Sequence, residues 1–167
     1  MADRPAGSGY GGQGFSLRGE KGRFVLPPAF RNTIAETSGT RVLCLAKHDR
    51  WPCLTAFGTD RPATFEDQID REEEKAIRLG QEFDRELRAL QLWSFQEIPF
   101  DASGRFVMPD TMSELGRIED SIYFQGIGAF FTLWNPALLE TMGPGFEGAQ
   151  AYSRKAVADA GAKGARK

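Results

Sequence analysis

The first candidates for chemistry in this sequence are a glycine motif, a histidine and a run of carboxylates. Residues 9–14 match the G-x-G-x-x-G pattern of dinucleotide-binding loops, but no strand is predicted before them and no β-α-β unit encloses them. His48 lies in a polar turn, and spacing nominates no serine or cysteine nucleophile for it. Residues 72–74 are three glutamates on one predicted exposed helix face. The sequence therefore predicts that the protein is not an enzyme.

The number of cysteines and histidines indicates whether the protein binds a metal or a cofactor and in which cellular compartment it is expected. Cys44 and Cys53 are expected to be buried free thiols on paired strands, and a single histidine leaves no cluster for a zinc site. We therefore expect no metal and no cofactor. The N-terminus lacks the apolar segment of a signal peptide, and no apolar run approaches the roughly 18–20 residues of a membrane helix. These features predict a cytoplasmic protein, reduced and without a membrane partner.

The residues that remain form a glycine-arginine turn that occurs twice. Residues 22–27 (GRFVLP) return as residues 104–109 (GRFVMP), an offset of 82. The arginine fork matches the O6 and N7 atoms of guanine, a lysine adds a point charge for phosphate, and a β-ribbon fits the DNA major groove. The plainer alternative is that Arg23 and Arg105 pair with carboxylates and pin their own hairpins. The duplicated turn is thus the candidate site.

The elements that must position these turns are also duplicated. Residues 42–45 match 122–125 and residues 54–57 match 131–134, in the same order as the turns. Each copy is predicted as a β-turn-β-α-β-β unit of about 45 residues, too few to bury a good core alone, so the two copies are expected to pack together. The helix of the first copy is predicted from Pro28 to Glu36, and Gly39 lies just beyond its end. The helix of the second copy is predicted to have Asp110 as its N-cap and to terminate at Gly116.

The predicted organisation has five segments. They are a flexible glycine-rich N-terminus (1–14), a first repeat (15–59), an amphipathic connecting helix (60–93), a second repeat (94–137) and a C-terminal helix with a basic flexible tail (138–167). In the connecting helix, apolar residues recur at spacings of mostly three and four, and Thr64 with Asp67 resembles a capping box. Residues 149–160 are predicted as a weak helix that frays from Gly161.

Residues 16–31 and 100–109 resemble the two signature segments of the MraZ transcriptional regulators, and the resemblance extends over roughly residues 15–144. It implies a β-rich α+β fold in which two SpoVT-AbrB-like modules form one intramolecular swapped-hairpin β-barrel. It also implies a homo-oligomeric ring that binds double-stranded DNA at tandem G-rich direct repeats. In that family the repeats precede the division and cell-wall gene cluster, which the regulator usually represses together with its own gene. A regulator of this kind is expected in the nucleoid.

The turn chemistry and the resemblance together predict the site residues. The expected DNA contacts are Arg18, Lys21, Gly22, Arg23, Arg31 and Arg105, with Asp101 and Gly104 orienting the second loop. The family pattern has an aspartate three residues before the glycine and often a lysine next to it. The second copy keeps the aspartate but has Ser103 at the lysine position, whereas the first keeps Lys21 but has Gly19 at the aspartate position.

The two copies also differ in charge. Residues 15–31 carry a net charge of +3, whereas the matching residues 97–113 carry −2. Only the first turn therefore lies in a potential that attracts phosphate, and we expect it to read DNA while the second supports the barrel or the ring. The alternative functions are an oligomeric scaffold that binds no DNA and an enzyme with an unrecognised site. The absence of a nucleophile-base pair in the sequence disfavours the enzyme.

Overall fold

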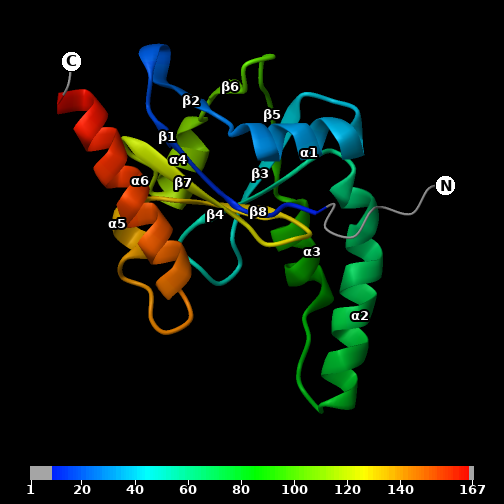
Figure 1. Ribbon diagram of the computed structural model, residues 1–167. Coiled ribbons are helices and arrows are strands. Elements are labelled where there is room, and N and C mark those ends of the chain that lie inside the picture. The colour runs from blue at the N-terminus through cyan, green and yellow to red at the C-terminus, as the bar shows by residue number, and fades with distance from the viewer. Residues whose placement is uncertain (1–8, 166–167) are drawn as a thin grey trace.

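The computed structural model describes residues 9–165, and its strands form one six-stranded and one two-stranded antiparallel sheet (Figure 1). The larger sheet has the order β1 (Gln13–Leu17), β7 (Ser121–Gly126), β8 (Phe131–Trp134), β4 (Leu54–Phe57), β3 (Val42–Lys47), β5 (Gln96–Pro99). The smaller sheet pairs β2 (Arg23–Val25) with β6 (Arg105–Val107). With the helices described below, the fold is of the α+β class, as predicted.

Each sheet contains strands from both sequence copies. β1 comes from the first copy and pairs with β7 of the second, while β5 comes from the second copy and pairs with β3 of the first. β4 pairs with its counterpart β8, and β2 pairs with its counterpart β6. Neither copy completes a sheet of its own, so the two share one core.

Aromatic side chains from both copies fill that core. Phe24 and Phe106 lie directly opposite each other in the small sheet, with ring centroids 6.2 Å apart. Phe30, on α1 (Pro28–Ser38), stacks on Phe131 at 4.6 Å and on Phe124 at 6.1 Å. The prolines that follow the Arg-Phe-Val strands open α1 and α4 (Asp110–Gly116), since proline is suited to the start of a helix.

The ends of these two helices agree with prediction in one case and differ in the other. Gly39 follows α1 in the left-handed conformation (φ 72°) and caps it, as predicted. In α4 the N-cap is Pro109 rather than Asp110, and Arg117 takes the left-handed position (φ 51°). Gly116 is the last helical residue and packs closely, because a Cβ there would lie 2.6 Å from Cγ of Leu54.

The connecting segment is two helices, so the prediction of one long helix was wrong. A short 3-10 turn, η2 (Arg61–Thr64), leads into α2 (Phe65–Arg78), and the chain reverses before α3 (Arg85–Trp93). The break falls where Gly80 adopts φ 66° and Asp84 caps α3 by accepting a hydrogen bond from the Leu87 N–H at 3.0 Å. The capping box was also wrong, because the Thr64 hydroxyl donates to the carbonyl of Arg61 at 2.7 Å.

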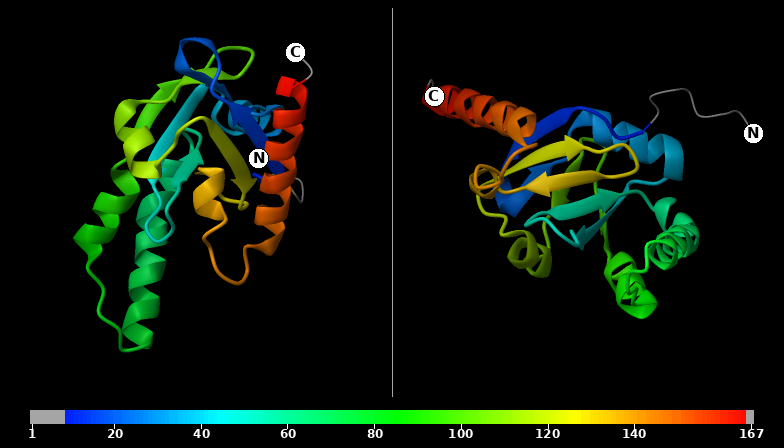
Figure 2. Two further views of the ribbon diagram at one scale, coloured as in Figure 1. Left: turned by 90° about the vertical axis from the view of Figure 1, so that its left-hand side faces the viewer. Right: turned by 90° about the horizontal axis from the view of Figure 1, so that it is seen from below.

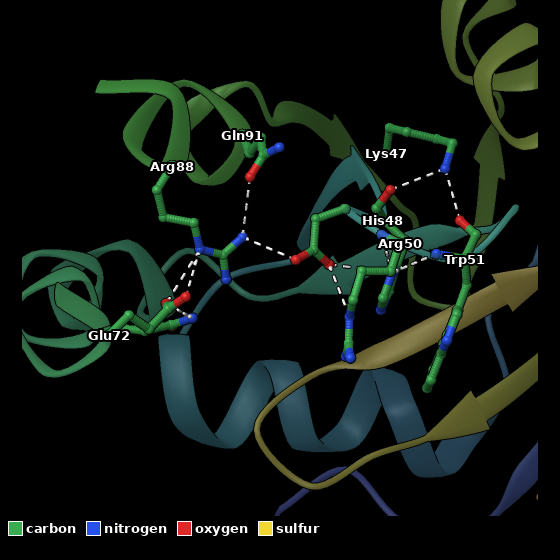
Figure 3. A network of polar contacts seen from close by, with 9 residues as sticks. Lys47, His48, Arg50, Trp51, Glu72, Arg88 and Gln91 are labelled. Carbon is green, nitrogen blue, oxygen red and sulfur yellow. Dashed lines mark hydrogen bonds and ion pairs between the residues drawn. The ribbon is translucent and has the colours of Figure 1, made fainter. Parts of the chain in front are cut away.

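Arg88 fixes this helical arm (residues 65–93) to the rest of the protein (Figure 3), and Arg85 joins the two helices within the arm. Nε of Arg88 lies 2.8 Å from Glu72 on α2, and its Nη1 lies 3.2 Å from Asp49 in the turn after β3. Arg85 meets carboxylates of α2 at 2.9–3.2 Å; they are Glu66, Asp70 and Glu73. The arm therefore projects from the sheet as a fixed extension, at the bottom of Figure 1.

Both ends of the chain are more ordered than predicted within the described residues. Tyr10 is buried and forms an isolated bridge with Gly128, and β1 begins at Gln13, so residues 9–14 belong to the fold. Residues 1–8 lie outside the described part. After α5 (Pro136–Leu139), the helix α6 (Glu147–Ala165) continues past Gly161 instead of fraying there. Across the described residues, the helices are too short or too polar to span a membrane.

Candidate nucleic-acid interface

The first turn (residues 18–22) joins β1 to β2 and displays its cations outward. The N–H of Gly19 donates to the carbonyl of Arg23 at 2.7 Å and closes the hairpin. Lys21 and Gly22 both have positive φ, 59° and 69°. A left-handed conformation costs a residue with a Cβ roughly 1–2 kcal/mol, so the fold keeps Lys21 in a disfavoured conformation that leaves it exposed at the tip.

The arginines of the first turn make few contacts with the protein. Arg18 is exposed, and its guanidinium lies over the ring of Phe24 at 5.3 Å. Arg23 is half-buried, and its Nε makes a single long contact of 3.5 Å with the carbonyl of Glu20. A cation held by one weak contact retains most of its donors for a ligand. The alternative that Arg23 pins its hairpin through a carboxylate therefore has no support in this geometry.

The second turn (residues 100–104) is organised by one carboxylate. Oδ1 of Asp101 accepts hydrogen bonds from the backbone N–H groups of Ser103 and Arg105 at 2.9 and 3.0 Å, and its Oδ2 lies 2.7 Å from Nε of Arg105. These contacts, with the backbone N–H of Arg105 foremost, hold the pKa of Asp101 below its ordinary value. Arg105 is thus paired within its own turn, whereas Arg23 has no such partner.

Arg31, which is among the predicted DNA contacts, lies on α1 and bonds to the second turn. Its Nη1 donates to the carbonyls of Leu26 and Ser103, each at 2.8 Å, and so ties α1 to the second turn. Gly104 lies beside it with φ 86°, and a Cβ there would come within 2.5 Å of both Nη1 of Arg31 and the carbonyl oxygen of Leu26. Arg31 and Gly104 therefore shape the second turn together.

The outer face of the β2–β6 ribbon was not anticipated as part of the site. Alternation around the buried Phe24 and Phe106 places Arg23 opposite Val107 and Val25 opposite Arg105 on that face. Val25 and Val107 are 41% and 57% exposed, unusual for valines in a strand. The alternation was visible in the repeated Arg-Phe-Val, but no role was predicted for the two valines. The ribbon presents two arginine-valine pairs to solvent.

Both turns project from the same end of the molecule. Figure 1 shows the β1–β2 and β5–β6 hairpins at the top, opposite the tip of the helical arm, and the left view of Figure 2 shows the same arrangement. The candidate DNA contacts predicted from the sequence, apart from Arg31, therefore lie on these two turns and the ribbon between them.

The other candidate groups have structural roles. His48 is buried and stacks on Trp51, and its Nδ1 accepts hydrogen bonds from the backbone N–H groups of Arg50 and Trp51 at 3.1 Å each. Burial lowers its pKa, so the ring is neutral at the turn that Figure 3 shows. Cys44 and Cys53 are buried free thiols, and burial raises the pKa of each to about 12. Within residues 9–165 no group of side chains has the composition of a metal site.

The fold and this site define an α+β protein that presents duplicated arginine turns at one end. Over 122 residues the chain is 30% identical to the transcriptional regulator MraZ of Gluconacetobacter diazotrophicus, covering 72% of this chain and 74% of the relative. It is 30% identical over 116 residues to that of Parvibaculum lavamentivorans, covering 70% and 69%. For Rhodospirillum rubrum the identity is 27% over 124 residues. No family profile matches the chain. The chain belongs to the MraZ family of transcriptional regulators.

Proposed function

We propose that this protein is a sequence-specific DNA-binding regulator that inserts its first turn into the major groove. The observation that carries this proposal is the contrast between Arg23, which has one 3.5 Å contact, and Arg105, which is paired with Asp101 at 2.7 Å. A guanidinium with free donors can bind guanine bidentately. Arg18 and Lys21 flank it for phosphate contacts, and the backbone of Gly22 allows the close approach.

The second turn supports the first in this proposal. Its net charge of −2 over residues 97–113 disfavours phosphate, and its arginine is already neutralised by Asp101. Val25 and Val107 add apolar contacts at the groove, where thymine methyl groups are exposed. Arg105 contributes mainly to the shape of the second turn.

The architecture that we propose is a swapped-hairpin barrel of two SpoVT-AbrB-like modules, residues 15–59 and 94–137. The exchange of β1 and β5 between the copies and the antiparallel β2–β6 ribbon support it. The two modules then behave as a dimer within one chain, and the ribbon lies on its local two-fold axis.

We also propose that the protein assembles into a homo-oligomeric ring through the helical arm. The arm exposes large apolar side chains in its described residues: Ile77 (71% exposed), Leu79 (57%), Leu87 (51%), Leu90 (64%) and Trp93 (44%). An apolar patch of this size on a fixed projection marks a protein interface, and a second copy of this chain is its proposed occupant. Assembly would place several first turns on one DNA, with multivalency supplying factors of about 10²–10⁴ in affinity.

The proposed targets follow the family. They are tandem G-rich direct repeats before the division and cell-wall gene cluster, where the protein would act in the nucleoid as a repressor that includes its own gene among its targets. The protein would need neither a cofactor nor a catalytic group. The alternative is an oligomeric scaffold that uses the same arm without binding DNA.

A titration against the upstream DNA of the protein's own gene tests this proposal. The regulator should bind that duplex in preference to a shuffled duplex of equal length, with an affinity that falls as salt is raised. Equal binding to both duplexes, or no salt dependence, would favour the scaffold.

A further inference from the structure

The C-terminal end of α6 lies at the same end of the molecule as the first turn and the β5–β6 hairpin, in Figure 1 and in the left view of Figure 2. It lines a groove of about 620 Å³ with β1 and β2, in which Lys163 and Ala160 face Leu17 and Val25. Asp159 lines the same groove. Leu17 directly precedes Arg18, so the groove that Lys163 lines begins where β1 enters the first turn.

The other half of α6 is firmly anchored. Phe146, just before the helix, packs edge-on against Trp51 at 5.1 Å and Trp134 at 5.9 Å. Gln150 donates to the carbonyl oxygens of Leu139 and Met142, each at 3.0 Å. One turn further, Arg154 pairs with Glu140 of the chain after α5 at 2.9 Å. These contacts fix the orientation of α6 relative to the sheet, and so they also fix the position of its C-terminal half.

The cations of α6 differ in their partners. Arg154 is paired with Glu140, and Lys155 is paired with Asp159 at 3.3 Å. No carboxylate of the described residues forms an ion pair with Lys163, which is exposed. Among the described residues of α6, Lys163 is thus the cation that no ion pair neutralises, and it lies in the part of the helix that lines the groove with β1 and β2.

We propose that the C-terminal end of α6 binds the phosphate backbone of the duplex whose major groove the first turn enters. This inference rests on the proposed DNA-binding function and adds a second contact outside the family signature segments. The major groove is about 12 Å wide, so an element that enters it has a phosphate strand on each side. The end of α6 flanks the first turn and meets one of those strands. Phosphate contacts add affinity and fix orientation without reading sequence.

Lys163→Ala tests this contact, with Lys155→Ala as the matched control. Both substitutions remove one positive charge from the same helix, and alanine is the best helix former, so both variants should keep α6 folded, as circular dichroism can verify. Fluorescence anisotropy would follow binding to the operator duplex and to a shuffled duplex between about 50 and 200 mM salt. Lys163→Ala should weaken binding to both duplexes and reduce the slope of log affinity against log salt by about 0.9. Lys155→Ala should leave the slope unchanged.

Each other outcome overturns the inference in a distinct way. A wild-type slope for Lys163→Ala would show that the residue touches no phosphate, while the DNA-binding function would stand. An equal loss in both variants would mean that only net charge matters and that α6 makes no local contact. A wild-type protein that binds neither duplex would overturn the proposed function and this inference together.

Discussion

Oδ2 of Asp101 lies 2.7 Å from Nε of Arg105, while the equivalent arginine of the first copy, Arg23, has Gly19 where the aspartate would be. The two copies of the turn therefore differ in how they hold their arginine. Asp101 forms an ion pair with Arg105 within the second turn, whereas Gly19 offers Arg23 no carboxylate and leaves its guanidinium available to a ligand. This single difference separates a turn that is satisfied internally from one that is suited to an external ligand.

The first prediction concerns the two arginines. Arg23→Ala should cost about 1–3 kcal/mol of specific binding and relax discrimination at one guanine, because it removes the available fork. Arg105→Ala should leave base preference nearly intact. It should instead lower the melting temperature or reduce the number of subunits in the oligomer. Binding to operator variants with single base changes would measure both effects. If Arg105→Ala abolished operator recognition in an intact oligomer while Arg23→Ala did not, the roles of the two turns would be reversed.

The second prediction is an acid-dependent contribution from Asp101. The pKa of Asp101 is lower in the folded protein than in the unfolded chain. The carboxylate therefore stabilises the fold fully at a pH above its pKa in the unfolded chain, and this stabilisation is lost as the pH falls through its pKa in the folded protein. Thermal unfolding from about pH 5 downward should show this loss in the wild type. Asp101→Asn keeps the shape of the side chain but not its charge, and should lack that component. An identical pH profile for the two proteins would contradict the assigned role.

The third prediction uses two glycines at equivalent positions. Gly22→Ala should reduce the free energy of unfolding by roughly 1–2 kcal/mol, the cost of positive φ, since nothing lies within 4 Å of the added Cβ. Gly104→Ala should cost more, because its Cβ would also come within 2.5 Å of the Leu26 carbonyl oxygen. Urea unfolding of the two variants makes the comparison. An equal loss in free energy of unfolding for the two variants would show that the second turn rearranges to accept the added Cβ at little cost.

The fourth prediction concerns the thiols. With a pKa of about 12, Cys44 and Cys53 carry little thiolate at neutral pH, and both should react with a thiol reagent only after unfolding. Replacing both by alanine should reduce the free energy of unfolding by about 0.5–3 kcal/mol per site and leave operator preference unchanged. A folded double variant that lost its sequence preference would indicate thiol chemistry at the site.

The fifth prediction tests assembly through the helical arm. Leu90→Asp places a charge on a side chain that is 64% exposed, so the folded chain should tolerate it while the oligomer dissociates. Sedimentation velocity would report the loss of mass, and binding to tandem repeats should weaken far more than binding to one repeat. Val157→Asp, on an exposed residue of α6, is the control and should leave the oligomer intact. A wild-type protein that is monomeric at micromolar concentration yet binds one repeat tightly would contradict the ring.

The sequence predicted the duplicated elements well because their signals are local. The alternating Arg-Phe-Val, the proline that opens each helix and Gly39 after α1 each act within a few residues. The break between α2 and α3 was missed because apolar spacing continues across it, although Gly80 marked the place. The hydrogen bond between Arg31 and Ser103 was not predicted because the two residues lie 72 positions apart. The glycines near Tyr10 were taken as flexible, but they pack against Gly126, where a Cβ would meet the Tyr10 carbonyl oxygen at 2.6 Å.

The exchange of strands between the copies also dictates how the chain can fold during synthesis. Leu17 of β1 pairs with Ser121 of β7, so β1 must wait for about a hundred further residues to leave the ribosome before its sheet can form. Until then the first copy has strand edges without partners, a state prone to aggregation. A gene cut between the two copies would therefore yield two insoluble fragments rather than two small working domains.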